Sequence, residues 1–241
     1  MIELPKEKRL ATRVNPGFII LYGKPKCGKT TALSMLDDCL ILDLEDGTEF
    51  LDALVLRVTD IKQLFEIARS IREAGKPYKY IAFDTASKLE DDIVLPLAKK
   101  FYTDTPQGKS WNGDDVKKLP SGAGYLYLRE AFKYIIDMFT PLCDTLILSA
   151  HCKEKQIEKE GKEMSEFEPD LTGKLSSIIS AKAHAIGYVY RDKNRTMVNF
   201  KGGDNYIVES RAEHLSNKEF VLIEKTDKGF IHYWDQIFIK T

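Results

Sequence analysis

The feature of this sequence that most constrains its fold is the segment at positions 23–30, which reads GKPKCGKT. Its spacing matches G-x-x-x-x-G-K-[ST], the phosphate-binding P-loop. The glycines allow a tight turn, so that successive backbone N–H groups can point at phosphate oxygens. Lys29 supplies a positive charge for the β- and γ-phosphates, and the hydroxyl of Thr30 can bind Mg²⁺. The motif therefore predicts a binding site for ATP and Mg²⁺.

The flanking sequence has the order that a P-loop requires. Residues 18–22 form a short apolar run typical of a strand buried on both faces, and residues 31–36 read as the first turns of a helix. The N-terminus of that helix would favour an anion. A chance match in an ordinary loop is the alternative, and this context disfavours it. We expect the nucleotide to contact Gly23, Lys24, Pro25, Lys26, Cys27, Gly28, Lys29, Thr30 and Thr31.

Composition narrows the class of protein. With 241 residues the chain suits one α/β domain with insertions. A formal net charge of −1 argues against a non-specific polycation, although it is compatible with a local basic groove. The four cysteines include no C-x-x-C pair, which indicates free thiols in a reducing cytosol. One of them, Cys27, lies inside the P-loop, so its alkylation should block nucleotide binding.

The sequence also bears on location. The charged N-terminus lacks the apolar stretch of a signal peptide. No run approaches the roughly 20 apolar residues that cross a bilayer. These features predict a soluble, cytoplasmic protein without a membrane partner.

Apolar runs and helical periods predict the remaining elements. Strands are expected at 39–43, 54–58, 80–85 and 145–150, and helices at 61–74, 87–101, 125–139 and 175–185. Antiparallel strands are expected at 186–190, 196–200 and 230–233, and segments 102–124 and 152–174 read as long loops. The predicted fold class is therefore α/β, a mostly parallel sheet flanked by helices with antiparallel strands at its C-terminal edge. We expect an N-terminal extension at 1–15 and a single domain at 16–241.

The strand expected at 80–85 carries a second phosphate-site signal. Apolar residues lead into Asp84, which is the Walker B pattern. A buried strand of this kind delivers a carboxylate to the sheet edge where ligands bind in open α/β sheets. We therefore expect Asp84 to hold Mg²⁺ beside Thr30.

The sequence Leu-Asp-Leu-Glu at positions 42–45 resembles RecA-type ATPases. In that family the strand beside the P-loop strand ends in a glutamate that activates the attacking water. The resemblance implies a RecA-like P-loop NTPase core in which Glu45 is the catalytic base, assisted by Lys29. For phosphoryl transfer to water, a protein mainly has to position the water molecule and neutralise charge on the phosphates. In the alternatives, Glu45 is a solvated carboxylate or Asp46 is the functional acid.

His151, which ends the run at 145–150, carries the resemblance further. In RecA-type ATPases a polar residue at this point senses the γ-phosphate. A strand-terminal Ala-His, followed by a region like PDLTGK at 169–174, resembles short phage-encoded RecA relatives of the single-strand annealing group. The likeness spans about 16–211, and it implies that His151 is a sensor rather than a strand cap. Those relatives often carry an acidic residue in the following helix, which positions 180–184 lack.

The resemblance also implies contacts with single-stranded DNA. By position, the segments at 102–124 and 152–174 correspond to the loops that face DNA in RecA. Aromatic side chains among lysines suit bases that stack and phosphates that need cations. A flexible, solvated loop is the alternative, because the second segment holds as many acids as bases. The residues that this hypothesis selects are Lys109, Trp111, Lys117, Lys118, Lys153 and Lys155.

RecA-like ATPases place ATP between neighbouring subunits, so the resemblance implies self-association in a ring or filament. A cation from the neighbour then stabilises charge in the transition state. Arg211 matches a basic position in the relatives, with Lys201 and Arg191 as further candidates. A surface salt bridge is an equally good interpretation of Arg211.

The leading hypothesis is an Mg²⁺-dependent, DNA-stimulated ATPase that acts on single-stranded DNA in phage recombination or replication. A phage single-strand binding or recombination protein is a further expected partner, in the cytoplasm of the host cell. The alternative from another class is a nucleotide-dependent binding module that assembles on a protein and hydrolyses little ATP. A P-loop kinase is disfavoured, because Glu45 resembles a water-activating base and no arginine-rich lid is evident.

Overall fold

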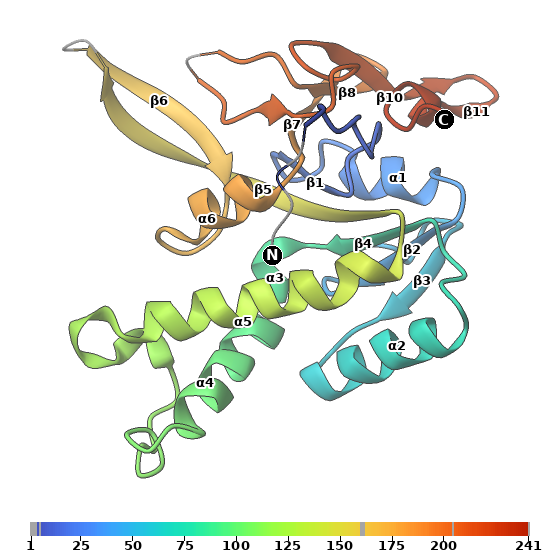
Figure 1. The fold of residues 1–241 in the computed structure, drawn as a ribbon. Coiled ribbons are helices and arrows are strands. Elements are labelled where there is room, and N and C mark those ends of the chain that lie inside the picture. The colour runs from blue at the N-terminus through green and yellow to red at the C-terminus, as the bar shows by residue number, and fades with distance from the viewer. Residues whose placement is uncertain (1–3, 5, 160–161, 204, 241) are drawn as a thin grey trace.

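The computed structural model describes residues 4, 6–159, 162–203 and 205–240, and it is built on one sheet (Figure 1). The order of its main path is β11-β10-β8-β7-β1-β5-β4-β2-β3. β6 pairs with β5, and β9 pairs with β7. The strands are β1 (Phe18–Gly23), β2 (Cys39–Asp43), β3 (Leu54–Arg57), β4 (Tyr80–Asp84), β5 (Thr145–Lys159), β6 (Lys162–Pro169), β7 (Ala185–Asp192), β8 (Arg195–Asn199), β9 (Glu209–Ser210), β10 (Glu219–Thr226) and β11 (Gly229–His232).

The central part of this sheet is parallel. β7, β1, β5, β4, β2 and β3 run in the same direction, and β8, β10 and β11 add antiparallel pairs on the C-terminal side. The P-loop strand β1 is separated from β4, which carries the Walker B aspartate, by β5 alone. This order confirms the predicted fold class, α/β with a mostly parallel sheet and antiparallel strands at the C-terminal edge.

Helices connect the parallel strands as the apolar periods predict. They are α1 (Lys29–Ser34), α2 (Ile61–Glu73), α3 (Ala86–Lys88), α4 (Leu95–Thr103), α5 (Gly124–Phe139) and α6 (Leu175–Lys182). A π-helical segment, Leu89–Val94, joins α3 to α4. Among the described residues, no helix is both long enough and apolar enough to cross a bilayer.

The sheet separates two apolar cores, because neighbouring residues of a strand point to opposite faces. Ile20 and Tyr22 of β1 pack in the core beneath α2, α5 and α6. Ile19 and Leu21 pack on the other face, against α1 and the C-terminal segment around Trp234. β1 is therefore buried on both faces, which explains its unbroken apolar sequence.

The prediction of a loop over 152–174 is wrong. β5 continues through the start of this segment and pairs with β6 in an antiparallel hairpin, which projects from the body of the molecule in Figure 1. Residues of opposite charge face each other across the hairpin, Lys153 opposite Glu168 and Lys155 opposite Glu166. Such cross-strand pairs stabilise a two-stranded ribbon. Nearer the tip Glu158 faces Glu163, a pair of like charges, so the charges are complementary in only part of the hairpin.

Two further segments differ from the sequence interpretation. β10 was not among the expected strands, although an apolar run at 220–223 signals it. The predicted loop at 102–124 contains two short 3₁₀ turns, and it is anchored by the buried side chains of Val116 and Leu119. This segment is therefore partly fixed to the body of the protein.

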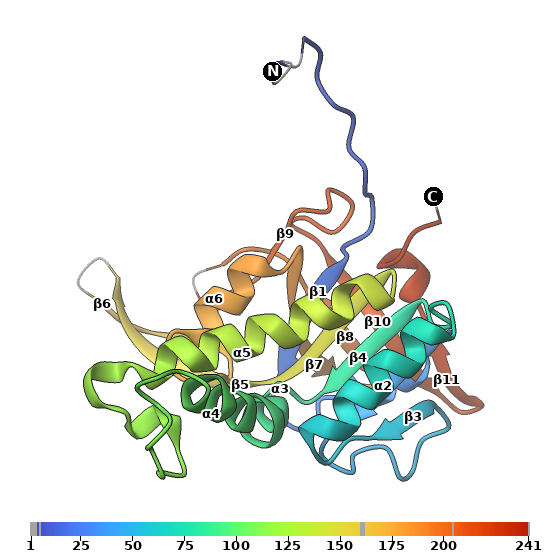
Figure 2. The same cartoon turned by 60° about the horizontal axis from the view of Figure 1, so that its bottom comes forward.

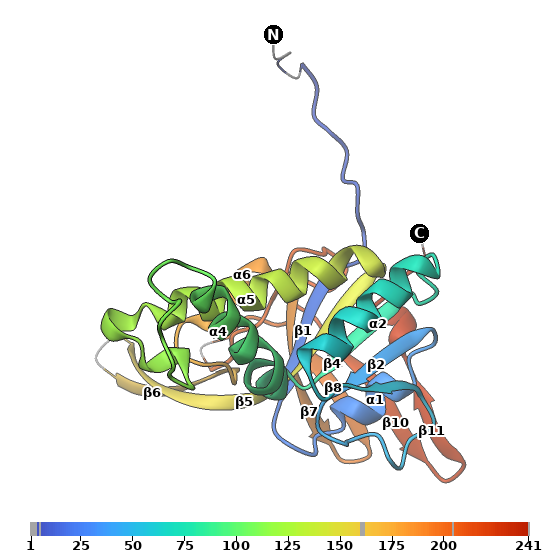
Figure 3. The same cartoon turned by 90° about the horizontal axis from the view of Figure 1, so that it is seen from below.

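Residues 6–12 run away from the sheet as an extended tail (Figures 2 and 3). Leu4 and Leu10 are 80% and 86% exposed. The tail joins the body at Arg13, which donates to the Asp144 carbonyl at 3.0 Å, and at Asn15, which exchanges hydrogen bonds with the Ile239 backbone.

Candidate active site

The P-loop joins β1 to α1, and close contacts require glycine at two of its positions. A Cβ added to Gly23 would lie 2.0 Å from the carbonyl oxygen of Val189 on the adjacent strand β7. Gly28 has φ of 99°, and a Cβ there would lie 2.5 Å from Thr196 Oγ1 on β8. A side chain at Gly23 would clash with the backbone of β7, and one at Gly28 would clash with the Thr196 side chain and strain a left-handed backbone conformation. The loop is therefore tight because it closes directly against β7 and β8.

Lys29, the first residue of α1, points its side chain into the loop. It is only 7% exposed, and its Nζ donates to the carbonyl oxygens of Gly23 at 3.0 Å and Lys24 at 3.1 Å. Cys27 Sγ lies 3.7 Å from the same nitrogen. The ammonium group thus lies at the centre of the loop, where the sequence predicts phosphate.

Thr30 and Asp84 meet at the end of the sheet. The Thr30 hydroxyl donates to Asp84 Oδ2 at 2.6 Å, and Asp84 is 3% exposed. Burial raises the pKa of Asp84, and the nearby hydroxyl groups of Ser149 and Thr30 oppose this shift. Its other oxygen, Oδ1, is buried without a hydrogen-bond partner among the described residues. A buried carboxylate oxygen that lacks a partner, beside a hydroxyl, fits the hard oxygen ligands that Mg²⁺ prefers.

Glu45 and His151 approach each other beside this pair. Glu45 lies just after β2, and its Oε1 is 3.4 Å from Nε2 of His151, which follows the buried part of β5. The hydroxyl of Thr85 donates to the same Glu45 oxygen at 2.6 Å. Thr85 escaped the sequence analysis, although it directly follows the Walker B aspartate. Thr85, which directly follows β4, and His151 on β5 are therefore both directed at one carboxylate oxygen.

Asp43, to which the sequence assigned no role, shapes the loop that carries Glu45. Its carboxylate accepts hydrogen bonds from the Glu45 amide at 2.9 Å, the Gly47 amide at 3.3 Å and the Thr48 hydroxyl at 2.5 Å. Burial alone would raise the pKa of Asp43. The hydrogen bonds from Thr48, Glu45 and Gly47 outweigh burial and hold that pKa below its ordinary value. A strand-terminal acid two residues before Glu45 was the available signal.

One cavity of about 680 Å³ is lined by Lys29, Thr30 and Thr85, among others. Its lining includes P-loop residues, Glu45, Asp84 and His151, so the structure brings the predicted catalytic and metal residues together. Phe50 lies at the rim and is 95% exposed. Arg191, which the sequence suggested as a cation for a neighbouring subunit, lines the cavity of its own chain.

The first segment of proposed DNA contacts lies beside α4 and α5. Trp111 packs edge-on against Tyr102 at 5.4 Å between ring centroids, and Lys99 lies over its ring at 5.9 Å. Part of the Trp111 ring is therefore covered by side chains of the same chain. The lysines of this segment keep exposed or half-exposed side chains; they are Lys109, Lys117 and Lys118.

The second segment of proposed contacts is the β5–β6 hairpin. Lys153 bonds the carbonyl oxygen of Leu171 and lies 3.3 Å from Glu168, so its charge is used within the hairpin base. Lys155 is exposed, two residues further along the strand. The two predicted lysines therefore differ in how freely they could meet a phosphate.

The remaining candidate cations lie outside the cavity. Arg211 donates to the carbonyl of Ala181 at 2.8 Å, at the end of α6. Lys201 lies 3.7 Å from Glu219. Neither residue lines the nucleotide cavity of its own chain.

Comparison with known proteins gives one family and a set of similar folds. The sequence matches the AAA domain family over residues 16–216, and no curated protein gives a significant match. A KaiC-like protein from Pyrococcus horikoshii OT3 is similar, with a TM-score of 0.46, 14% identity and 90% of each chain covered. The RadB recombinase is similar, with a TM-score of 0.45, 12% identity, and 91% of this chain and 92% of that chain covered.

Proposed function

This chain belongs to the AAA domain family, and from that premise we propose that it is an Mg²⁺-dependent ATPase that acts on single-stranded DNA. The observation that carries the ATPase proposal is the cavity itself. P-loop residues, Asp84, Glu45 and His151 come from four separate segments of the chain and line one space of about 680 Å³. An ion pair that only stabilised the fold would not require side chains from four segments to line one space.

Lys29 and the P-loop amides bind and orient the triphosphate in this proposal. The helix N-terminus at Lys29 adds a favourable dipole for the anion. Thr30 and Asp84 would hold Mg²⁺, which when bound neutralises charge on the phosphate oxygens. The unpartnered Oδ1 of Asp84 supports this assignment.

Glu45 is the proposed general base. Its carboxylate would take a proton from the water that attacks the γ-phosphate, while ADP leaves from the opposite side. Thr85 and His151 fix one oxygen of that carboxylate, and Asp43 fixes the backbone of its loop. His151 lies beside Glu45 and on the strand that continues into the hairpin, so it is suited to report the presence of a γ-phosphate.

Action on DNA, self-association and a role in phage recombination are the finer parts of the proposal. They rest on the resemblance to short RecA relatives, and on exposed lysines near Trp111 and along the hairpin. Arg211 is the proposed cation supplied to a neighbouring subunit. A protein that binds ATP, barely hydrolyses it and assembles on a partner is the competing function.

ATP turnover with and without single-stranded DNA separates these functions. We expect hydrolysis that requires Mg²⁺ and rises with DNA, and an Asp84→Asn variant that needs more Mg²⁺. An Asp137→Asn variant is the matched control, because that carboxylate is exposed on α5 and outside the cavity. Tight ATP binding with negligible turnover under all conditions would favour the binding module instead.

A further inference from the structure

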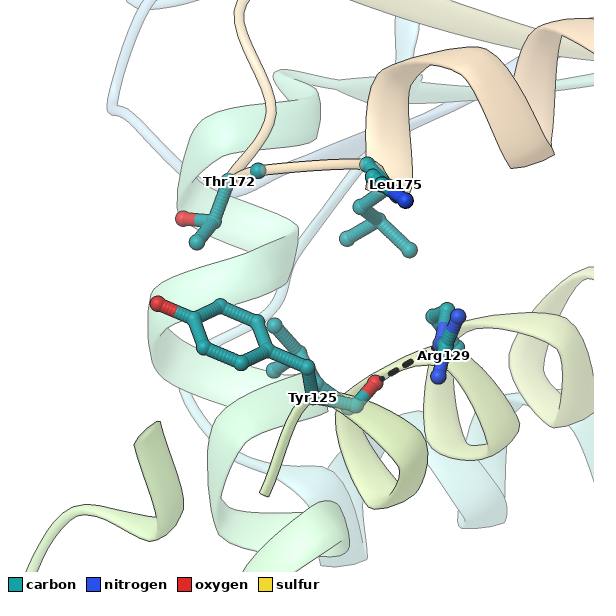
Figure 4. A pocket seen from close by; sticks show the side chains of 7 residues that line it. Tyr125, Arg129, Thr172 and Leu175 are labelled. Carbon is teal, nitrogen blue, oxygen red and sulfur yellow. Dashed lines mark hydrogen bonds between the residues drawn. The ribbon is translucent and has the colours of Figure 1, made fainter. Parts of the chain in front are cut away.

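A second cavity, of about 350 Å³, lies between the start of α5 and the loop that precedes α6 (Figure 4). We call it the Tyr125 cavity. None of its lining residues belongs to the nucleotide cavity. Its walls are formed by Tyr125, Leu128 and Arg129 on one side and Thr172, Lys174 and Leu175 on the other.

The lining combines an aromatic ring, an apolar floor and positive charge. Leu128 and Leu175 are each 1% exposed, whereas Tyr125 is 39% exposed. Arg129 and Lys174 supply two cations, and no carboxylate of the described residues lines the cavity. Nε of Arg129 donates to the carbonyl oxygen of Tyr125 at 3.0 Å (Figure 4), which leaves its other guanidinium N–H groups for a ligand. Within the described parts of the chain, neither cation forms an ion pair. This chemistry suits a ligand with a flat face and a negative charge close to it.

The wall opposite α5 is held in place by hydrogen bonds. The Thr172 amide donates to Glu90 Oε2 at 2.9 Å, and Glu90 is 3% exposed on the π-helical segment that follows the Walker B strand. Lys153 bonds the carbonyl of Leu171 on the other side. The loop is therefore fixed before any ligand arrives, which lowers the entropic cost of binding.

The same loop is connected to the nucleotide cavity. The amide of Asp170 donates to the carbonyl oxygen of His151 at 2.9 Å. The His151 ring lies 3.4 Å from Glu45. If His151 moves when nucleotide binds, its hydrogen bond to Asp170 would transmit the movement to Thr172, which lies two residues later in the wall of the Tyr125 cavity.

We propose that the Tyr125 cavity binds one nucleotide of single-stranded DNA, with its base against Tyr125 and its phosphate between Arg129 and Lys174. The inference rests on the proposed function and names a binding site for it that differs from the residues selected by sequence. Every base has a face that can stack on an aromatic ring, and every phosphate needs a cation. An acidic peptide could satisfy the cations, but it offers no flat group to the tyrosine ring.

The test is fluorescence anisotropy with a labelled oligothymidine and a non-hydrolysable ATP analogue. Tyr125→Ala should weaken binding by roughly 5- to 150-fold, because it removes one base stack. Tyr125→Phe should bind like the wild type, since it keeps the ring. Arg129→Gln with Lys174→Gln should lower the slope of log affinity against log salt by roughly 0.7 for each lost phosphate contact.

Lys133→Gln is the matched control, because Lys133 is exposed on the same helix one turn beyond Arg129 and outside the cavity. ATP turnover without DNA should be the same in all these variants. Equal binding by wild type and Tyr125→Ala would overturn the assignment of the site, although DNA binding itself would stand. Wild-type protein that binds no oligothymidine would instead refute the DNA part of the proposed function. Competition with an acidic peptide tests the class of ligand. If the peptide displaces DNA from the wild type but not from Tyr125→Ala, the cavity is a peptide site, and the assignment to a nucleotide of DNA is wrong.

Discussion

The two cavities of this molecule are built in different ways. The nucleotide cavity takes its groups from the ends of parallel strands, where the sheet places Gly23 beside His151 and Asp43 beside Asp84. The Tyr125 cavity lies between a helix and a loop held by individual hydrogen bonds. Substitutions in the nucleotide cavity should therefore remove a reactive group without moving the backbone of the sheet. Substitutions near the Tyr125 cavity should instead change the shape of that cavity.

The largest effect is expected from the P-loop. Lys29→Ala should lower ATP turnover by roughly 10²-fold or more, because it removes a preorganised charge from the phosphates. Nucleotide affinity by calorimetry should fall with it, while the melting temperature stays close to that of the wild type. Lys62→Ala is the control, since Lys62 is exposed on α2 and lies outside the nucleotide cavity. Normal ATP affinity in Lys29→Ala would remove the basis of the nucleotide assignment.

Glu45→Gln should separate binding from hydrolysis. The amide keeps the shape of the side chain and loses the base, so turnover should drop by roughly 10²-fold while ATP affinity is kept. Steady-state kinetics and calorimetry on the same preparation measure both quantities. Asp46→Asn is the control that distinguishes neighbouring acids. If that variant loses turnover and Glu45→Gln does not, the base is Asp46.

The contrast between the cavities also explains what the sequence could predict. Buried parallel strands have unbroken apolar runs, so the positions of Lys29, Asp84 and His151 followed from motif and period. The role of Thr85 depends on a side-chain hydrogen bond to Glu45, forty positions earlier, which no local pattern encodes. Asp43 differs, because its partners lie two to five positions ahead in its own loop, and the strand-terminal acid was a local signal for it.

The β5–β6 hairpin is a second feature that the sequence alone could not predict. Lys153 and Glu168 are fifteen positions apart, and their opposition across β5 and β6 is visible only when the strands are paired. The Tyr125 cavity likewise joins α5 to a loop more than forty residues later. Long-range pairing of this kind leaves no periodic signal in a single sequence.

An intermediate effect is expected from the bond that holds the Tyr125 cavity. Glu90→Ala removes the acceptor of the Thr172 amide, so the loop should loosen and oligonucleotide binding should weaken by roughly 3- to 10-fold. Glu90→Gln keeps an acceptor and is the matched variant. ATP affinity should be unchanged in both, which anisotropy and calorimetry would check. A large loss of ATP affinity in Glu90→Ala with an unchanged melting temperature would contradict the separation of the cavities.

The smallest effect is expected at His184, which belongs to neither cavity. A substitution there should change the stability of the fold and leave nucleotide and DNA binding unchanged. Its Nδ1 accepts the amides of Gly17 and Phe18, each at 3.0 Å, at the start of β1. Burial lowers the pKa of His184, and the nearby guanidinium groups of Arg13 and Arg211 lower it further. The unfolded chain therefore takes up a proton at a higher pH than the folded one. The stability that this residue contributes should be complete above about pH 6.5 and should decline as the pH falls below that value.

Urea midpoints of the wild type and His184→Gln, measured at about pH 7.5 and about pH 5.5, test this prediction. Glutamine offers one oxygen to the same amides and has no proton to gain. Its midpoint should therefore fall less than that of the wild type between the two conditions, and ATP affinity at the higher pH should be equal in both. Because His184 is partly exposed, the difference should be modest. An identical fall in the two proteins would mean that protonation of His184 is tolerated in the folded state, and that the start of β1 is held by the sheet without this bond.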